Sequence, residues 1–361
     1  MNIVKATRKF EQWLGRHTTI IKPDLQYKHE QMSKFAFPFL RATFYRWAEV
    51  FPEVCREIAE SPRVLAVGDL HIENFGTWRD AEGRLVWGVN DFDEATALPY
   101  TNDLVRLATS ALLAVKEGKL RLNGQAACDA ILDGYIGSLR EGGGPFVLEE
   151  KHGWLRDLAL GRLRDPVVFW EKMDLLPTAQ GEIPLSARDA LGYFLPKPDS
   201  SYRLARRRSG LGSLGRVRLV ALAEHHGAKV AREVKALFIS SVFWSQDSDR
   251  PHEIMCQVIA NQAVRCHDPF YRIRDRWIVR RLSPHCSRIG LSDLPSDRNE
   301  LRLLHAMGWE TANVHLGSKY AIKQIRASLK QLPSKWLASA AKKMEKTVLD
   351  DWKVWKQEIK S

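Results

Sequence analysis

The chain has 361 residues, of which 45% are hydrophobic, and its 55 lysines and arginines outnumber its 43 aspartates and glutamates to give a formal net charge of +12. This length and composition allow a large core, for which we expect two lobes. They exclude a membrane span, because the most apolar run, Leu104–Val115, is short and contains Arg106. We also expect no secretory signal, because residues 1–28 are polar and mostly basic.

The cysteines and the excess of positive charge limit the environment and the partners. Five cysteines, far apart and odd in number, predict free thiols in a reducing cytoplasm, and no CxxC pair indicates zinc. The charge has two interpretations: a solvated basic surface, or an anionic partner such as a nucleotide, a phosphorylated acceptor, a nucleic acid or a membrane surface. No short block interleaves arginines with aromatic residues as nucleic-acid modules do. The charge also counts against a polycationic aminoglycoside as the acceptor.

The first periodic segment predicts a buried helix. Leu40, Phe44, Trp47 and Phe51 recur at helical spacing and indicate the core face of a helix that begins around Pro38, a residue tolerated in a first turn. Arg41 lies among them and has two interpretations, a phosphate ligand or an ion pair, of which we favour the ion pair.

Three short apolar runs then predict strands over 63–67, 75–78 and 85–89, with a hairpin turn over 80–83. Because a hairpin returns the chain to its starting point, Asp91 is expected beside Asn74 and near Asp69. Their converging oxygens are the kind of ligand that Mg²⁺ prefers.

The spacing of these residues favours phosphoryl transfer. Kinase-type sites have the same parts in the same order: an aspartate, an asparagine five residues later, a hairpin and then Asp-Phe. Asp69 would orient or deprotonate an acceptor hydroxyl, Asn74 would hold a metal ion, and Asp91 would bridge the metal to the phosphates. Asp93 is a candidate second metal ligand and Glu94 a candidate loop salt bridge.

The same stretch carries a resemblance. Gly68-Asp-Leu-His-Ile-Glu-Asn-Phe-Gly76 and Asn90-Asp-Phe-Asp-Glu94 resemble the aminoglycoside and choline kinase branch of the protein-kinase-like superfamily. They resemble more closely a bacterial domain-of-unknown-function family with the same GDxHxxNFG and NDFDE blocks. His71 of the first block is interpreted as structural, orienting the loop by hydrogen bonds, rather than as a base.

A helix over 104–116 follows, with Asp103 near its N-cap. The resemblance implies that Asp103 braces the catalytic loop, and Arg106, one turn on, is a candidate partner for it. A second helix is predicted over 120–139 and is closed by Gly142–Gly144. Prolines divide 146–195 into short helices, and 196–198 is interpreted as a linker.

A glycine-rich turn, Ser209-Gly-Leu-Gly-Ser-Leu-Gly215, runs into an alternating strand and resembles the phosphate-covering loop of kinases. Gly210, Gly212, Ser213 and Gly215 are therefore candidate nucleotide ligands, although a plain hairpin turn explains such a pattern equally simply. The next strand ends near Lys235, which would neutralise the α- and β-phosphates of a nucleotide.

The order of these parts is unusual, because the glycine loop and lysine follow the catalytic aspartate. We therefore predict a circularly permuted arrangement, since a site is defined by geometry rather than by chain order. The acidic partner of Lys235 is expected on a helix over 251–267, with Glu253 as first choice and Gln262 or Glu233 as alternatives. A strand over 277–282 and helices over 298–316 and 321–359 complete the chain, with Trp336, Trp352 and Trp355 as core candidates.

Together these features predict a helix-rich α+β protein with a permuted, protein-kinase-like two-lobed fold. Its expected parts are a catalytic helical lobe over 1–198, a small β-rich nucleotide lobe over 199–290 and C-terminal helices over 291–361 that pack back on the first lobe. The expected function is an ATP- and Mg²⁺-dependent cytoplasmic phosphotransferase acting on an unidentified hydroxyl. The alternatives are a non-catalytic nucleotide-binding pseudokinase and a metallophosphoesterase, for which the expected GNH block is missing. Nucleotidyl rather than phosphoryl transfer also stays open.

Overall fold

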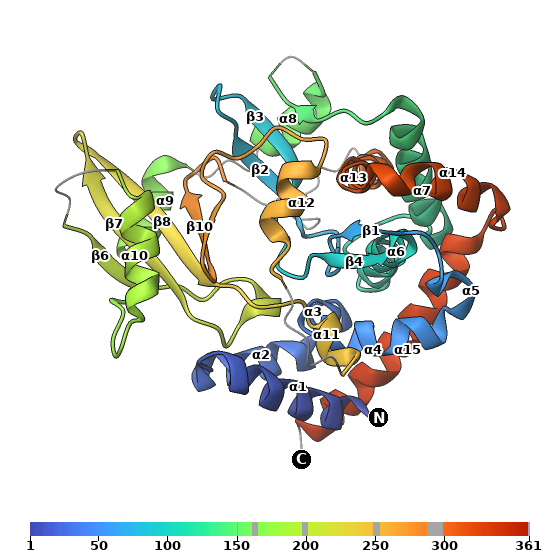
Figure 1. Cartoon of the computed structure of the whole chain (residues 1–361), viewed down its shortest axis with the longest axis horizontal. Helices are drawn as coiled ribbons and strands as arrows, with labels where there is room; N and C mark the ends of the chain where they lie inside the picture. The colour runs from blue at the N-terminus through green and yellow to red at the C-terminus, as the bar shows by residue number, and fades with distance from the viewer. Residues whose placement is uncertain (150, 161–164, 197–200, 248–252, 287–298, 360–361) are drawn as a thin grey trace.

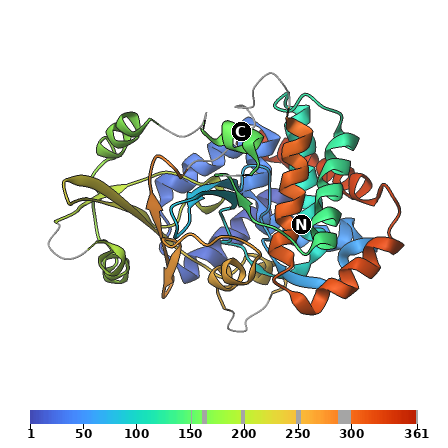
Figure 2. The ribbon, with the colours of Figure 1, turned by 90° about the horizontal axis from the view of Figure 1, so that it is seen from above.

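The structure, a computed structural model, describes residues 1–149, 151–160, 165–196, 201–247, 253–286 and 299–359. The protein is α+β and rich in helix, as predicted. An antiparallel sheet lies at one end and most of the helices lie at the other (Figures 1 and 2). All five cysteines are free thiols, which agrees with the sequence prediction. Within the described residues, no helix combines the length and the apolar character that a membrane crossing needs.

The N-terminal part is a series of helices: α1 (Ile3–His17), α2 (Lys22–Lys34), α3 (Ala36–Ala42), α4 (Phe44–Val54) and α5 (Arg56–Ala59). The single helix expected from about Pro38 is in fact two, α3 and α4. The break falls at Thr43, which lies outside helical geometry and whose hydroxyl donates to the Phe39 carbonyl at 2.8 Å. The predicted core positions, Leu40, Phe44, Trp47 and Phe51, are all buried.

The three predicted strands are confirmed as β1 (Arg63–Ala66), β2 (Phe75–Arg79) and β3 (Leu85–Val89). β2 and β3 form the expected hairpin, in which Phe75 pairs with Val89. β1 pairs instead with β4 (Thr96–Pro99), and the short β5 (Phe146–Val147) extends the hairpin at β3. The ends of β1, β2 and β3 thus carry the two loops in which the candidate site residues occur.

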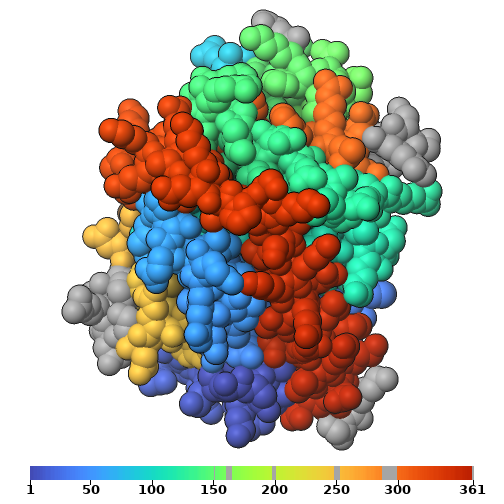
Figure 3. All heavy atoms as spheres, turned by 90° about the vertical axis from the view of Figure 1, so that its right-hand side faces the viewer, coloured from blue at the N-terminus to red at the C-terminus, as the bar shows by residue number. Residues whose placement is uncertain are grey.

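A layer of helices packs against the strands that carry these loops. It consists of α6 (Tyr100–Lys116), α7 (Gly124–Glu141), α13 (Glu300–His315), α14 (Ile322–Gln331) and α15 (Trp336–Glu358). The long C-terminal helix expected over 321–359 is divided, because Pro333 lies between α14 and α15. α7 and α13 cross closely at Gly134, where a Cβ would lie 1.9 Å from the His305 carbonyl oxygen. Helix α15 packs against α6 and α4 and is exposed on the face of the molecule shown in Figure 3.

The second part is a five-stranded antiparallel sheet in the order β6-β7-β8-β10-β9. Its strands are β6 (Arg203–Arg206), β7 (Arg218–His225), β8 (Ala228–Ala236), β9 (Arg272–Arg274) and β10 (Trp277–Leu282). The short helices α9 (Pro166–Asp174) and α10 (Leu185–Phe194) lie beside this sheet. Among the other short elements, α8 (Gly153–Leu160) belongs to the main core, α11 (Val242–Ser245) packs on α4, and α12 (Cys256–Gln262) packs on α13. The 3₁₀ turns η1 (Leu211–Ser213) and η3 (Lys319–Ala321) contact α3 and α14. The helix predicted over 251–267 is thus only α12, and residues 251 and 252 lie outside the described residues.

The two faces of this sheet differ in chemistry. One face packs apolar side chains, among them Val234 and Trp277, against α10. The opposite face carries Lys235 and Glu233, which are 2% and 4% exposed, and their cross-strand partners Arg218 and, on β10, Arg280. Helix α10 therefore packs with the sheet, although it lies in the range 1–198 that was predicted to form the first lobe. Of the linker predicted over 196–198, residues 197 and 198 lie outside the described residues.

Candidate active site

The loop after β1 is held in place by a buried carboxylate. Asp103, in the first turn of α6, accepts hydrogen bonds from the backbone N–H groups of Val67 at 2.7 Å and Gly68 at 2.9 Å. Gly68 has φ +80°, and a Cβ there would lie 2.7 Å from the Glu94 carbonyl oxygen, so only glycine fits. His315 contacts the same carboxylate at 3.1 Å. Asp103 thus occupies the bracing position that the sequence predicted for it.

Asp69 follows in this loop and faces a fully buried arginine. Arg106 Nε donates to Asp69 Oδ1 at 2.9 Å, and its Nη2 donates to the Leu40 carbonyl at 2.9 Å. The expected pairing of Arg106 with Asp103 is replaced by this one, because Asp103 is engaged by backbone N–H groups. Burial raises the pKa of Asp69 to about 7, against the opposing effect of Arg106. A carboxylate with such a pKa is suited to accept a proton near neutral pH.

The hairpin brings Asn74, Asp91 and Asp93 to the same place as Asp69. The Asn90 backbone N–H donates to the Asn74 carbonyl at 2.9 Å, and all four side chains line one small cavity of about 50 Å³. Asn74 Oδ1 and Asp93 Oδ1 are buried and have no hydrogen-bond partner among the described residues. Buried oxygens are normally paired, and unpaired acceptors of this kind fit a cation.

These oxygens are a sparse ligand set. The described residues contain no group of three His, Cys, Asp or Glu side chains that is placed to hold a metal ion. Mg²⁺ commonly binds through one or two carboxylates and completes its shell with water and substrate phosphates. Asn74, Asp91 and Asp93 therefore fit a magnesium ion that arrives with a polyphosphate rather than a closed metal centre.

Lys235 reaches this acidic group from β8. Its Nζ lies 2.5 Å from Asp93 Oδ2 and 3.7 Å from Asp91 Oδ1, and its side chain is 3% exposed. These aspartates, rather than Glu253, Gln262 or Glu233, are its acidic partners.

The three expected partners fail for geometric reasons. Glu253 is exposed and forms no ion pair with Lys235 in the part of the chain that the structure describes. Gln262 is exposed at the end of α12 and carries no charge. Glu233 is paired with Arg207 and, at 3.1 Å, with Arg218.

The glycine-rich loop lies against Asp69. Gly210 and Gly215 have φ +73° and +93°, so both need glycine, and a Cβ at Gly212 would lie 3.1 Å from the Arg41 carbonyl oxygen and 3.4 Å from Asp69 Oδ2. Ser213 Oγ accepts a hydrogen bond from Arg218 Nη2 at 2.8 Å. Residues 210–213 of the loop therefore line the same small cavity as Asp69.

Other residues of the first block have structural partners. His71 Nδ1 accepts from the Glu73 backbone N–H at 3.2 Å, in keeping with its structural interpretation. Arg41 forms an ion pair with Glu73 at 2.5 Å, which is the alternative favoured for it. Glu94 accepts from the Ser241 backbone N–H at 2.6 Å and lies 3.8 Å from Arg216, close to the loop salt bridge expected of it.

Lys28, on α2, was missed by the sequence reasoning. Its Nζ donates to the Gly212 carbonyl at 3.3 Å, and its side chain lines the same small cavity as Asp69. Burial lowers the pKa of Lys28 to about 8. No sequence signal distinguishes this lysine from the others of the basic N-terminal region, because its role depends on a contact across 184 residues.

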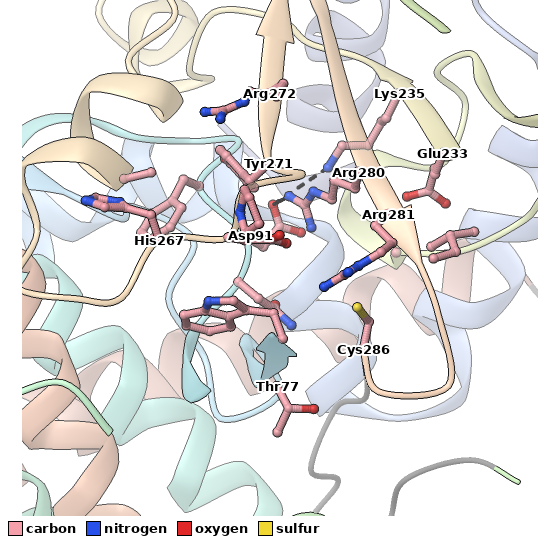
Figure 4. Close-up of a pocket in the computed structure, with 18 of the residues that line it drawn as sticks. Thr77, Asp91, Glu233, Lys235, His267, Tyr271, Arg272, Arg280, Arg281 and Cys286 are labelled. Carbon is pink, nitrogen blue, oxygen red and sulfur yellow. Dashed lines mark ion pairs between the residues drawn. The ribbon is translucent and has the colours of Figure 1, made fainter. Parts of the chain in front are cut away.

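A much larger cleft, of about 940 Å³, opens on the other side of Asp91 and Lys235 (Figure 4). Its charged lining residues are the seven basic Arg207, Arg218, Lys235, Arg265, Arg272, Arg280 and Arg281, and the four acidic Glu73, Asp91, Glu233 and Asp268. Lys235 and Arg280 both point toward Asp91 in Figure 4, and Arg280 Nη2 lies 3.9 Å from Asp91 Oδ1. The volume is in the range of small-molecule sites.

Comparison with known protein families gives a match over part of the chain. Residues 21–152 match a family described as "uncharacterized protein conserved in bacteria (DUF2252)". This match covers both acidic blocks and supports the predicted resemblance to a bacterial domain-of-unknown-function family. No curated protein and no solved structure matches the chain.

Proposed function

We propose that the protein is an ATP- and Mg²⁺-dependent phosphotransferase with a permuted, two-lobed, kinase-like arrangement. The observation that carries this proposal is that an unpaired amide oxygen of Asn74 and an unpaired carboxylate oxygen of Asp93 lie beside Asp69, with the Lys235 ammonium paired to Asp93. In kinase-type sites, positioning and charge neutralisation supply most of the catalysis, and these are the parts such a site needs.

Each residue has a defined task in the proposed reaction. Asp69 accepts the proton of an acceptor hydroxyl while the hydroxyl oxygen bonds to the γ-phosphorus, and the bond from that phosphorus to the β-phosphate oxygen breaks to release ADP. Lys235 and the loop 210–215 hold the phosphates. Asn74, Asp91 and Asp93 would hold Mg²⁺, which neutralises charge on the phosphates when bound. The larger cleft, on the far side of Asp91, has room for the remainder of the nucleotide.

The non-catalytic alternative also has an observation in its favour. The glycine loop packs on Asp69, and Arg106 occupies one of its carboxylate oxygens, so Asp69 is enclosed. A nucleotide-binding pseudokinase would keep this enclosure when ATP binds. The sparse metal ligand set counts against a metallophosphoesterase, whose metal centre needs more ligands than these. We place the phosphotransferase in the cytoplasm, where ATP is supplied and thiols stay reduced.

The test is ATP turnover to ADP by purified protein, with water as the acceptor while the natural acceptor is unidentified. Asp69→Asn is nearly isosteric but cannot accept a proton, so turnover should fall by about 10²-fold or more while ATP still binds. Asp91→Asn should lose most of the thermal stabilisation that Mg²⁺ and ATP give the wild-type protein. The control Asp129→Asn, exposed on α7, should change neither. Wild-type turnover equal to that of Asp69→Asn, with ATP bound by both, would favour the pseudokinase.

A further inference from the structure

The large cleft contains a group of buried hydrogen-bond donors that lack acceptors. Arg265 Nη1, Tyr271 Oη, Arg280 Nε and Nη2, and Arg281 Nε are all buried without a hydrogen-bond partner among the described residues. All four residues line the same cleft. An unpaired buried polar group costs free energy, so several donors in one cleft indicate a ligand that supplies acceptors.

Aromatic rings hold these guanidinium groups in place. Arg265 lies over Trp78, with its Cζ 4.4 Å from the ring centroid. Arg281 lies over Phe270 at 4.2 Å and Arg280 over Tyr271 at 5.1 Å. A ring covers one face of each planar group, and this leaves the N–H groups at its edge available for a ligand.

Most acidic residues of the cleft already have basic partners, several of them in the cleft itself. Glu233 is paired with Arg207 and Arg218, and Glu73 with Arg41. Asp91 lies 3.7 Å from the Lys235 ammonium and 3.9 Å from Arg280 Nη2. Burial raises the pKa of Asp268. Because seven basic residues and four acidic ones line the cleft, it keeps an excess of positive charge.

We propose that Arg265, Tyr271, Arg280 and Arg281 form a binding site for a phosphate group, separate from the phosphates expected at Lys235. Guanidinium edges match phosphate oxygens in pairs, and a phosphate offers enough acceptors for several donors at once. Burial keeps the Tyr271 hydroxyl protonated by raising its pKa, so this hydroxyl can donate to the anion. The site does not depend on phosphoryl transfer and goes beyond the function proposed above.

Two sources can supply such a phosphate. It can belong to the nucleotide, on a position distant from the group bound at Lys235, or to a separate phosphorylated acceptor. Both have the same chemistry at these four residues, and competition with ATP distinguishes them.

The experiment is a calorimetric titration of the full-length protein with inorganic phosphate. Wild type should give saturable binding, and Arg265→Gln should weaken it about tenfold or more, because a charged hydrogen bond to the anion is lost. Arg188→Gln removes an exposed arginine of α10 outside the cleft and should bind phosphate as wild type does. Absence of saturable binding, or equal binding by all three proteins, would overturn the proposal.

Tyr271→Phe separates binding from folding. It removes only a buried hydroxyl that has no partner among the described residues, so the midpoint of thermal unfolding without ligand should stay the same or rise. Phosphate binding should nevertheless weaken by roughly threefold to tenfold. If the hydroxyl has only a structural role, the affinity for phosphate will be unchanged. That result would show that Tyr271 does not bind phosphate and would contradict the proposed site.

Repeating the phosphate titration with saturating Mg²⁺ and ATP shows whether the natural phosphate at this site belongs to the nucleotide or to a separate ligand. Loss of phosphate binding would mean that a phosphate of the nucleotide occupies the site. Retained binding would mean a separate phosphorylated ligand, and either result keeps the site. If ATP does not bind at all, the proposed phosphotransferase fails while the titration without ATP still tests the phosphate site.

Discussion

The two cavities, whose linings share Asp91, differ in the unpaired polar groups that they contain. The small cavity beside Asp69 contains two buried oxygens without hydrogen-bond partners among the described residues, on Asn74 and Asp93, and one such donor, Arg41 Nε. In the large cleft, the unpaired buried atoms are donors on arginines and a tyrosine. Unpaired acceptors favour a cation, and unpaired donors favour an anion.

This difference has a simple structural origin. The acceptors come from one hairpin of the N-terminal part, whereas most of the cleft arginines come from the sheet and its connections, more than a hundred residues later. The lysine at the boundary pairs with the acidic side and also lines the basic side. A metal ion bound to a polyphosphate has this division of charge, and the predictions below test it from the largest expected effect to the smallest.

Removing the charge of Glu233 should have the largest effect. Burial alone would raise the pKa of Glu233, but Arg218, Arg207 and Arg280 outweigh it and lower the pKa from 4.5 to about 2. Glu233→Gln would leave these buried arginines without their shared anion, and it should lower the free energy of unfolding by about 3 kcal/mol at neutral pH. Chemical denaturation measures this loss.

The same variant has a pH signature. A lowered pKa in the folded state gives stability that is present above pH 4.5 and is lost as pH falls through about 2, so wild type and variant should converge in acid. Glu224→Gln, exposed on β7, is the matched control and should be neutral. Equal stability of wild type and Glu233→Gln at neutral pH would show that the arginines do not depend on this carboxylate.

Lys235→Ala tests the boundary between the two cavities. It should weaken binding of Mg²⁺–ATP about tenfold, because a buried cation facing the phosphates is lost, and Lys235→Arg should not fully restore it. Mg²⁺ alone should bind more tightly, since Asp91 and Asp93 lose their competing cation. Calorimetry measures both affinities, and Lys229→Ala, an exposed lysine on the same strand, is the control. If Lys235→Ala binds Mg²⁺ and Mg²⁺–ATP with wild-type affinity, Lys235 is not part of the binding site.

The pH dependence of turnover tests Asp69. Its pKa is raised to about 7 by burial, and only the deprotonated carboxylate can accept a proton. Turnover should therefore rise about tenfold per pH unit below pH 7 and level off above it. A rate that is constant between about pH 5 and 8 would exclude Asp69 as the base.

Gly212→Ala should have the smallest effect. The added Cβ would meet the Arg41 carbonyl oxygen at 3.1 Å and Asp69 Oδ2 at 3.4 Å, so the loop must move by a few tenths of an ångström. Turnover should fall a few-fold, and Gly212→Val should lower it further. Gly192→Ala, on α10 with nothing within 4 Å, should leave turnover unchanged and stabilise the helix by up to about 1 kcal/mol. Full activity of Gly212→Val would mean that the loop does not cover the reacting phosphates.

The elements set by local pattern were predictable from the sequence. Strands β1, β2 and β3 and their hairpin follow from short apolar runs and a polar turn, and the hairpin alone places Asn74 beside Asp91. The proximity of Lys235 to Asp91 was predicted from the chemistry of phosphate binding rather than from any pattern. The division of the last helix at Pro333 was also open to prediction, because proline interrupts helical hydrogen bonds.

The partners of charged residues were not predictable in the same way. Glu253 was chosen for Lys235 by its place in the chain, whereas the actual partner, Asp93, lies on a hairpin more than a hundred residues earlier. Arg106 was assigned to Asp103, a near neighbour, but backbone N–H groups already occupy that carboxylate. Such pairings depend on how strands and loops distant in sequence meet, and a single sequence does not contain that information.

The most direct test of the account is a calorimetric titration of ATP into the wild-type protein, once with Mg²⁺ and once with EDTA. The account predicts one site that binds ATP about tenfold or more tightly with Mg²⁺. Without the cation, the carboxylates of Asp91 and Asp93 repel the polyphosphate, and Asn74 Oδ1 stays without a partner among the described residues. No binding under either condition, or equal affinity with and without Mg²⁺, would contradict it.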